Sequence, residues 1–272
     1  MNVARVLADT ARSLSPVSAT PRLDAELLLA HALGISREQL LLRGGQGPVP
    51  ASYEGLVARR RACEPIAYIV GHRAFWTLDL FVAPGVLIPR PDSETLIEAA
   101  IAHFGESGPR RVLDMGTGSG ALLLAALDQW PHATGVGVDI SDAALTIARA
   151  NAERLGLSGR ASVERGGWDA ASKGDFDLVL CNPPYIETEA ILPSDVADFE
   201  PASALFAGPD GLDDYRRIAP LLRLPAGGLA CIEIGAAQAR AVQALFAAEE
   251  FLTQVKTDLA GHDRCVIVMP RG

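Results

Sequence analysis

Apolar residues recur at helical spacing through about the first seventy residues. In VARVLADTARSL, the side chains of Val3, Val6, Leu7 and Leu14 fall along one face of a helix. Similar spacing predicts three further helices, at LDAELLLAHAL, SREQLLLR and YEGLVARRRAC. This part of the chain has two interpretations, a plain helical bundle or a recognition module for a macromolecule.

Capping residues indicate where these helices begin and end. Thr20 is suited to cap a helix that begins at Pro21. The N–H groups of the first turn have no partner within the helix, so a proline, which has no N–H, fits its first position. Gly34 is expected to end that helix. Ser36 and Gln39 form a capping-box pattern at the start of the next helix.

Between about residues 74 and 90, bulky apolar residues alternate with other residues. The segment FWTLDLFVAPGVLIPR also contains a Pro-Gly turn at Pro84-Gly85, and together these features predict a β-hairpin. We expect this hairpin to connect the helical part to the rest of the chain.

Strand-like and helix-like segments alternate from about residue 92. Strands are predicted at RVLDMG, TGVGVDI, ASVERG, FDLVLCN, GGLACIEIG, LTQVKTDL and RCVIVMP, with helices between most of them. This alternation predicts an α/β fold, a mainly parallel sheet with helices on both faces. Only LAGHD separates the last two strands, so they are expected to form an antiparallel pair at the sheet edge.

Composition and charge narrow the class of protein. The chain has 272 residues, of which 49% are hydrophobic, as in a packed globular protein. Its net charge of −9 disfavours direct nucleic acid binding, which relies on basic residues to neutralise phosphates. No apolar segment is long enough to span a membrane. Four cysteines without metal-ligand spacing predict free thiols, no metal site and a cytoplasmic location: Cys63, Cys181, Cys231 and Cys265.

Special residues follow four of the predicted strands. They are Gly116, Thr117, Gly118, Ser119 and Gly120 after the first, Asp139 after the second, Trp168 just past the third, and Asn182, Pro183, Pro184 and Tyr185 after the fourth. Ligands of open α/β sheets bind at the carboxyl ends of the strands. The sequence therefore predicts one site at this edge.

The glycine loop and Asp139 together indicate an adenosine-containing cofactor. The loop allows a ligand to approach the backbone at a helix N-terminus, and a carboxylate about twenty residues on can accept both ribose hydroxyls. A packing turn and a helix-start aspartate are the alternatives. Trp168 either stacks on the adenine ring or fills core space. NAD and S-adenosylmethionine (AdoMet) both fit these residues.

The tetrapeptide Asn182-Pro183-Pro184-Tyr185 is the most specific feature. Two prolines directly after an apolar strand cannot continue a sheet ladder, so they give a rigid exit with free backbone carbonyls. The Asn182 oxygen and one such carbonyl can hold both hydrogens of an NH2 group, while Tyr185 offers a face for a planar group. Orientation of this kind is a means of activating a poorly nucleophilic planar nitrogen.

These motifs resemble those of class I AdoMet-dependent methyltransferases that act on planar nitrogen. Within that class, the chain resembles the protein-(glutamine-N5) methyltransferases that modify peptide chain release factors. The resemblance includes PIAYIVGHRAFW, VLIPRPDSETLIEAA, DMGTGSG, NPPYI, FEPASALFAGPDGLDDYRRI, ACIEIG and DLAGHDR. One departure is Asp92-Ser93-Glu94, where family members usually have Glu-Thr-Glu.

The resemblance implies a domain plan and roles for the site residues. It implies a helical substrate-recognition domain at 1–73, a β-hairpin linker at 74–91 and a seven-stranded Rossmann-like methyltransferase domain at 92–272. Contacts with AdoMet are implied for Gly116 to Gly120, Asp139, Trp168 and Asn182. The residues Asn182 to Tyr185 are implied to hold the glutamine of a release factor's Gly-Gly-Gln (GGQ) motif. We expect a monomer.

The expected reaction is methyl transfer to the glutamine side-chain nitrogen. The NH2 group donates to the Asn182 side-chain oxygen and the Pro183 carbonyl, its plane packs on Tyr185, and the nitrogen attacks the methyl group. An adenine-N6 methyltransferase acting on DNA or RNA is the alternative, although no basic, aromatic-rich segment supports it. A second alternative is an NAD dehydrogenase or a nucleotide-binding module. The dinucleotide-binding fingerprint accepts an alanine such as Ala121 after its glycines, but this alternative does not explain the tetrapeptide.

Overall fold

The computed structural model describes residues 3–42, 48–172 and 176–271. The chain divides into two compact units. The first comprises residues 1–72 together with Leu192–Phe199, and the second comprises residues 73–191 and 200–272. Each unit is described by itself.

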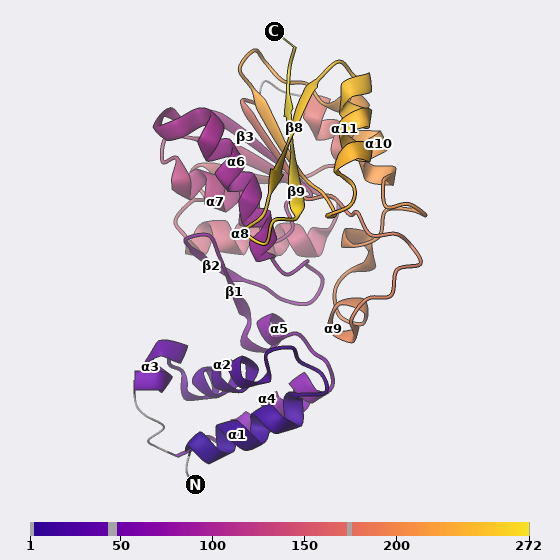
Figure 1. Ribbon diagram of the computed structural model, residues 1–272. Helices are drawn as coiled ribbons and strands as arrows, with labels where there is room; N and C mark the ends of the chain where they lie inside the picture. Colours follow the sequence, from indigo (N-terminus) through magenta and orange to yellow (C-terminus); the bar gives the residue numbers. More distant parts are fainter. Residues whose placement is uncertain (1–2, 43–47, 173–175, 272) are drawn as a thin grey trace. The chain divides into compact units, whose positions relative to one another are not determined.

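The first unit is helical. Its helices are α1 (Val3–Leu14), α2 (Pro21–Leu33), α3 (Arg37–Leu42), α4 (Ser52–Arg61), α5 (Ile66–Val70) and α9 (Ser194–Ala197) (Figure 1). Its core consists of buried side chains on α1, α2 and α4, with Leu14, Leu28 and Leu29 fully enclosed. The apolar spacing predicted α1 to α4, because each of them has an apolar face to bury, whereas α5 and α9 were not predicted.

The helix ends follow two of the three predicted capping patterns. Ser36 and Gln39 form the capping box, since the Ser36 N–H donates to Gln39 Oε1 and the Gln39 N–H donates to Ser36 Oγ. Gly34 ends α2 in a left-handed conformation, with φ of 63°. The predicted cap by Thr20 is wrong, because its side chain makes no capping bond and its hydroxyl donates to the Asp24 carboxylate.

A buried arginine attaches α9 to the first unit. Arg60 on α4 is 5% exposed and pairs with Asp24 of α2 at 2.9 Å and with Asp195 of α9 at 3.4 Å. It also donates to the Val17 carbonyl oxygen. This placement of residues 192–199, more than 120 positions from the rest of the unit, was not predicted from the sequence.

A two-stranded hairpin precedes the larger sheet. Its strands are β1 (His72–Phe75) and β2 (Leu78–Phe81). The turn lies at Trp76-Thr77, so the prediction that Pro84-Gly85 marks the hairpin turn is wrong. Side chains from elsewhere in the second unit hold the turn, because Glu94 accepts from the Trp76 N–H and Asp128 accepts from the Thr77 hydroxyl.

The second unit contains a seven-stranded sheet of order β5-β4-β3-β6-β7-β9-β8. Its strands are β3 (Arg111–Met115), β4 (Thr134–Asp139), β5 (Ala161–Arg165), β6 (Leu178–Cys181), β7 (Leu229–Glu233), β8 (Leu252–Thr257) and β9 (Asp263–Met269). The strands β3 to β7 run parallel, and β9 is antiparallel to both β7 and β8. The predicted α/β fold and the antiparallel terminal pair are confirmed.

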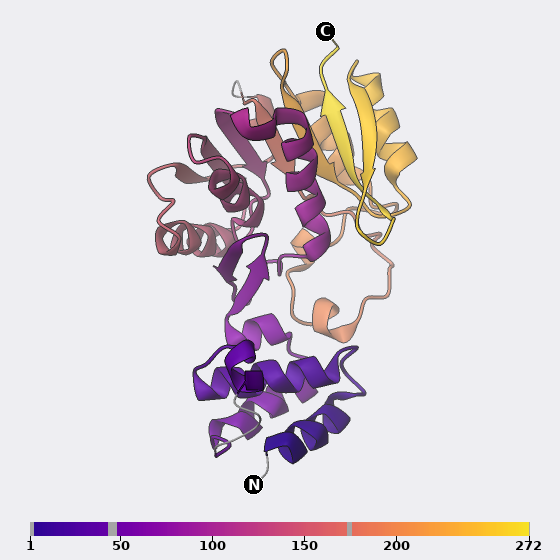
Figure 2. The ribbon, with the colours of Figure 1, turned by 60° about the vertical axis from the view of Figure 1, so that its left-hand side comes forward.

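Helices cover both faces of this sheet (Figures 1 and 2). On one face lie α6 (Glu94–Phe104), α7 (Ala121–Gln129) and α8 (Asp142–Arg154), and on the other α10 (Asp213–Ile218) and α11 (Ala239–Ala248). Short 3-10 helices complete the unit: η1 (Pro91–Ser93), η2 (Gly105–Ser107), η3 (Trp168–Ser172), η4 (Ala202–Ala204) and η5 (Ala219–Leu221). Each face has its own apolar core.

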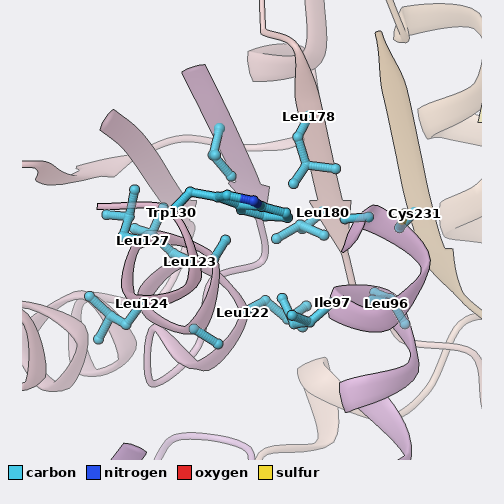
Figure 3. Close-up of a cluster of buried hydrophobic side chains, with 14 of the residues drawn as sticks. Leu96, Ile97, Leu122, Leu123, Leu124, Leu127, Trp130, Leu178, Leu180 and Cys231 are labelled. Atoms are coloured by element: carbon cyan, nitrogen blue, oxygen red, sulfur yellow. The ribbon is translucent and has the colours of Figure 1, made fainter. Parts of the chain in front are cut away.

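Trp130 lies in the core on the α6 and α7 face. Figure 3 shows it beside Leu178 and Leu180 of β6 and the leucines of α7. Its ring is 1% exposed, and its indole N–H donates to the Gly105 carbonyl oxygen at 3.0 Å. Burial therefore leaves no polar group of this ring unpaired.

The described helices include none that is both long and apolar enough to cross a membrane. In the same part of the chain, no group of three or more His, Cys, Asp or Glu side chains is arranged to hold a metal ion.

Candidate active site

A cavity of about 470 Å³ lies at the carboxyl ends of the parallel strands in the second unit. Eight of the residues predicted for the site line it: Gly116, Thr117, Gly118, Ser119, Asp139, Trp168, Asn182 and Pro184. The other predicted residues, Gly120, Pro183 and Tyr185, lie next to these in sequence but do not line the cavity. Parallel strands bring residues from distant parts of the sequence to one edge.

The glycine loop connects β3 to α7. Gly116, Gly118 and Gly120 all have positive φ, of 69°, 55° and 84°, a region that side chains other than glycine rarely adopt. A Cβ on Gly120 would lie 3.0 Å from a methyl carbon of Leu124, so Gly120 serves the packing of α7 rather than the cavity wall. Gly116 and Gly118 line the cavity together with Thr117 and Ser119.

Asp139 ends β4 beside this loop. Its carboxylate accepts from the Gly118 N–H at 3.0 Å and from the Ser141 N–H at 2.9 Å. The N-cap of α8 is Ser141, whose hydroxyl accepts from the Ala144 N–H, so Asp139 lies before the helix. Each carboxylate oxygen retains acceptor capacity toward the cavity.

Trp168 lies between the core and the cavity. Its ring packs partly against the core on the α10 and α11 face and also lines the cavity. Its indole N–H donates to Asp214 at 2.9 Å, and a Cβ on Gly116 would lie 3.3 Å from the ring. The flat ring is therefore fixed in orientation against the glycine loop.

Asp114, the fourth residue of β3, is a cavity residue that the sequence reasoning missed. One carboxylate oxygen accepts from the Thr117 hydroxyl at 2.6 Å and the Leu123 N–H at 3.2 Å, while the other is buried without a partner in the described chain. Burial raises the pKa of Asp114 to about 7. An acidic residue inside the apolar run RVLDM, directly before the glycine loop, was the available signal.

The tetrapeptide leaves β6 beside the glycine loop. Asn182 donates from its side-chain nitrogen to Ser93 Oγ on η1 at 3.2 Å. The Tyr185 hydroxyl donates to the Glu233 carboxylate at 3.3 Å. The backbone carbonyl oxygen of Tyr185 accepts from the Gln238 side chain at 3.0 Å. Both ends of the tetrapeptide are thus held by side chains from other elements.

Glu233, the last residue of β7, lies behind the tetrapeptide. It is 1% exposed, and one of its carboxylate oxygens has no hydrogen-bond partner in the described chain. Burial raises the pKa of Glu233 to about 7, while Ser93, Arg264 and Tyr185 act against that rise. It does not line the cavity. The sequence showed Glu233 at a strand end but gave it no role.

Comparison with known proteins gives matches over most of the chain. Residues 5–71 match the family described as PrmC N-terminal domain, and residues 92–200 match the methyltransferase small domain. The release factor glutamine methyltransferase of Rhodospirillum rubrum is 45% identical over 260 residues, covering 92% of this chain and 79% of the relative. The corresponding protein of Caulobacter vibrioides is 42% identical, covering 91% and 89%.

A solved structure with a similar fold is a 16S rRNA methyltransferase of T. thermophilus in complex with AdoMet and guanosine. It is 22% identical, has a TM-score of 0.51, and the match covers 74% of this chain and 50% of that one. At this identity the likeness concerns the fold. The two relatives, by contrast, share more than two fifths of their residues with this chain over most of both lengths. The chain therefore belongs to the release factor glutamine methyltransferase family.

Proposed function

We propose that this protein transfers a methyl group from AdoMet to the side-chain amide nitrogen of the glutamine in the GGQ motif of a peptide chain release factor. Membership of the family supports the reaction and the substrate. The observation that carries the proposal is that Asn182 and Pro184 line the same cavity as the glycine loop. Asn182, which is proposed to hold the substrate amide, therefore lies in the same cavity as the proposed cofactor-binding residues.

The residues lining the cavity fit AdoMet. The Asp139 carboxylate has acceptor capacity for ribose hydroxyls, and the Trp168 ring presents a fixed flat surface. The unpartnered oxygen of Asp114 suits the ammonium group of the methionine part, because a buried anion gains most from a cationic partner. When bound, AdoMet supplies an electrophilic methyl group on a positively charged sulfur.

Asn182 and Pro183 hold the substrate nitrogen in this proposal. Because the Asn182 side-chain nitrogen donates to Ser93, its oxygen is left as an acceptor for one hydrogen of the glutamine NH2 group. The Pro183 carbonyl oxygen accepts the other hydrogen. Two acceptors at fixed separation set the direction of the nitrogen lone pair, and orientation of this kind accelerates reactions of weak nucleophiles.

Tyr185 packs against the plane of the substrate amide. Its ring is held at both ends, through the hydroxyl by Glu233 and through the backbone by Gln238. Burial raises the pKa of the Tyr185 hydroxyl, so the ring stays neutral and acts as a donor to Glu233. The substrate nitrogen loses one proton to solvent during or after methyl transfer, since the two acceptors are too weakly basic to keep it.

A methyl-transfer assay tests the proposed function. Labelled AdoMet is incubated with a release factor, with its GGQ glutamine-to-alanine variant and with DNA. We expect label only on the unaltered factor, located on the glutamine by mass spectrometry. Label on DNA would favour the adenine-N6 alternative, and cofactor binding without transfer to either the factor or the DNA would overturn the substrate assignment.

We also propose that the protein acts in the cytoplasm, as a monomer and without binding nucleic acid. The net charge of −9 supports a protein rather than a nucleic acid partner. Four free cysteines support a reducing compartment. The helical domain at 1–73 is proposed to recognise the substrate, with the hairpin region 74–91 as a linker and residues 92–272 as the catalytic domain.

A further inference from the structure

Two features are left without a role by the proposed function, Glu233 and the departure at Asp92-Ser93-Glu94. The structure brings them together, because Ser93 lies beside the Glu233 carboxylate and also accepts from the Asn182 side chain. Ser93 is 4% exposed and Glu233 is 1% exposed. Ser93 and Glu233 are therefore buried neighbours, and Ser93 is hydrogen-bonded to the half-buried Asn182.

The orientation of the Asn182 amide decides whether it can hold the substrate. An asparagine side chain has an oxygen on one side and an NH2 group on the other, and the two are similar in shape. If the Asn182 amide were turned by 180°, its own NH2 group would face the NH2 group of the substrate, and neither group could accept a hydrogen bond from the other. Some neighbour must therefore distinguish the oxygen from the nitrogen.

Ser93 alone cannot make that distinction. A hydroxyl both donates and accepts, so it could accept from the Asn182 nitrogen or donate to the Asn182 oxygen. An ionised carboxylate, by contrast, only accepts. With Glu233 ionised, the Ser93 hydrogen is directed to the carboxylate, and the Ser93 oxygen is left to accept from Asn182.

We propose that Glu233 is a positioning residue that fixes, through Ser93, the direction in which Asn182 presents its oxygen to the substrate amide. The proposal rests on the proposed function for its consequence in catalysis. The Tyr185 hydroxyl also donates to Glu233, so the same carboxylate fixes both ends of the tetrapeptide. Glu233 itself touches neither the cavity nor the substrate.

The surroundings of Glu233 make this control sensitive to pH. Arg264 of β9 favours its ionised form and Asp92 of η1 opposes it, while the Tyr215 hydroxyl donates to its backbone oxygen. The thiol of Cys265 on β9, also close by, is neutral because burial raises its pKa. Below a pH of about 7, Glu233 gains a proton and becomes a donor as well as an acceptor, so the direction of the chain is no longer fixed.

The first test compares Glu233→Gln with the unaltered enzyme, because glutamine has nearly the same shape but both donates and accepts. We expect kcat for a release factor to fall by about tenfold to a hundredfold, as for other losses of orientation, with AdoMet affinity unchanged. The acid limb of kcat near pH 7 should disappear. An equal loss of AdoMet affinity, or an acid limb that persists in this variant, would overturn the proposal.

Three further variants sharpen this test. Ser93→Ala should lower kcat, and Ser93→Thr should restore it, because threonine keeps the hydroxyl. Asp92→Asn should move the acid limb to lower pH, since it removes a negative charge that raises the pKa of Glu233. Glu249→Gln, which removes an exposed carboxylate on the same unit, should leave the pH profile unchanged.

A spectroscopic measurement separates this inference from the proposed function. In NMR spectra of the cofactor-free protein, the side-chain amide signals of Asn182 should titrate with a midpoint near pH 7, and Glu233→Gln should abolish the titration. This result does not depend on any methyl transfer. Absence of label on release factors would therefore remove the proposed substrate, whereas an Asn182 amide that does not sense Glu233 would overturn the positioning role.

Discussion

Two carboxylates are buried in the same sheet, Asp114 near the end of β3 and Glu233 at the end of β7, with β6 between these two strands. Each has one oxygen without a hydrogen-bond partner in the described chain, and burial raises the pKa of each to about 7. They differ in what they face. Asp114 lines the cavity beside the glycine loop, whereas Glu233 lies behind the tetrapeptide that we propose holds the substrate.

A raised pKa therefore does not by itself show what a buried carboxylate does. Asp114 lines the cavity that we propose binds AdoMet, so in that proposal its charge is available to a cationic ligand. At Glu233 the carboxylate contacts only protein groups, so its charge orders their hydrogen bonds. The predictions that follow separate a cofactor-binding side of the site from a substrate-holding side.

The largest effect is expected from Asn182→Ala on the substrate-holding side. Removing an acceptor that is aligned with the reacting nitrogen should lower kcat by about a hundredfold or more, by analogy with the loss of one aligned hydrogen-bonding group in other active sites. AdoMet affinity, measured by calorimetry, should change little. A matching loss of affinity would mean that Asn182 binds the cofactor more than it orients the substrate.

Asp114→Asn should have the next largest effect, on the cofactor-binding side. Replacing a buried carboxylate that pairs with an ammonium group should weaken AdoMet binding by about tenfold or more, since such charged hydrogen bonds contribute about 1.5–3 kcal/mol. S-adenosylhomocysteine, which keeps the ammonium group, should lose affinity to a similar extent. Unchanged affinity for both ligands would contradict this role for Asp114.

A smaller effect is expected in the protons exchanged when AdoMet binds. Because the pKa of Asp114 is about 7 in the cofactor-free protein, a cationic ligand should favour the ionised carboxylate and release a fraction of a proton near pH 7. Affinity should therefore rise as the pH rises through about 7. Calorimetry in buffers of different ionisation enthalpy measures this release, which Asp114→Asn should remove and Glu233→Gln should leave in place.

The smallest effect is expected on stability. A carboxyl whose pKa rises on folding contributes stability that is fully present below its unfolded pKa, here 4.5, and that is lost as the pH rises through about 7. Glu233→Gln should therefore lose less stability than the unaltered protein between pH 5 and pH 8. Denaturant unfolding at the two pH values, with Glu249→Gln as the control, measures the difference.

Much of the fold and part of the site could be predicted from short stretches of sequence. Alternating strands and helices after residue 92 fixed the α/β class, because each element carries its own periodicity. The glycine loop and Asp139 stand directly at strand ends, and the parallel arrangement of β3 and β4 then brings them within hydrogen-bond distance. Local pattern and one topological rule were sufficient for these features.

The hairpin turn and the attachment of α9 could not be predicted in this way. The turn at Trp76-Thr77 is held by Glu94 and Asp128, which are 18 and 51 positions away. Asp195 meets Arg60 across 135 positions. The local sequence does not indicate contacts over such distances. The Pro-Gly pair at 84–85 was therefore the better candidate for the hairpin turn, although that turn forms at Trp76-Thr77.

The sequence by itself indicated most of the predicted residues that line the cavity, because strand ends and the Asn-Pro-Pro-Tyr tetrapeptide can be recognised from consecutive positions, but it did not indicate Asp114. Only the tertiary structure decided how those residues are oriented. The side chain of Asn182 depends on Ser93, which is 89 positions away, and Tyr185 depends on Glu233, which is 48 positions away. The direction of a hydrogen bond is a property of the pair and its surroundings, and burial of Glu233 between separate elements exists only after the chain has folded.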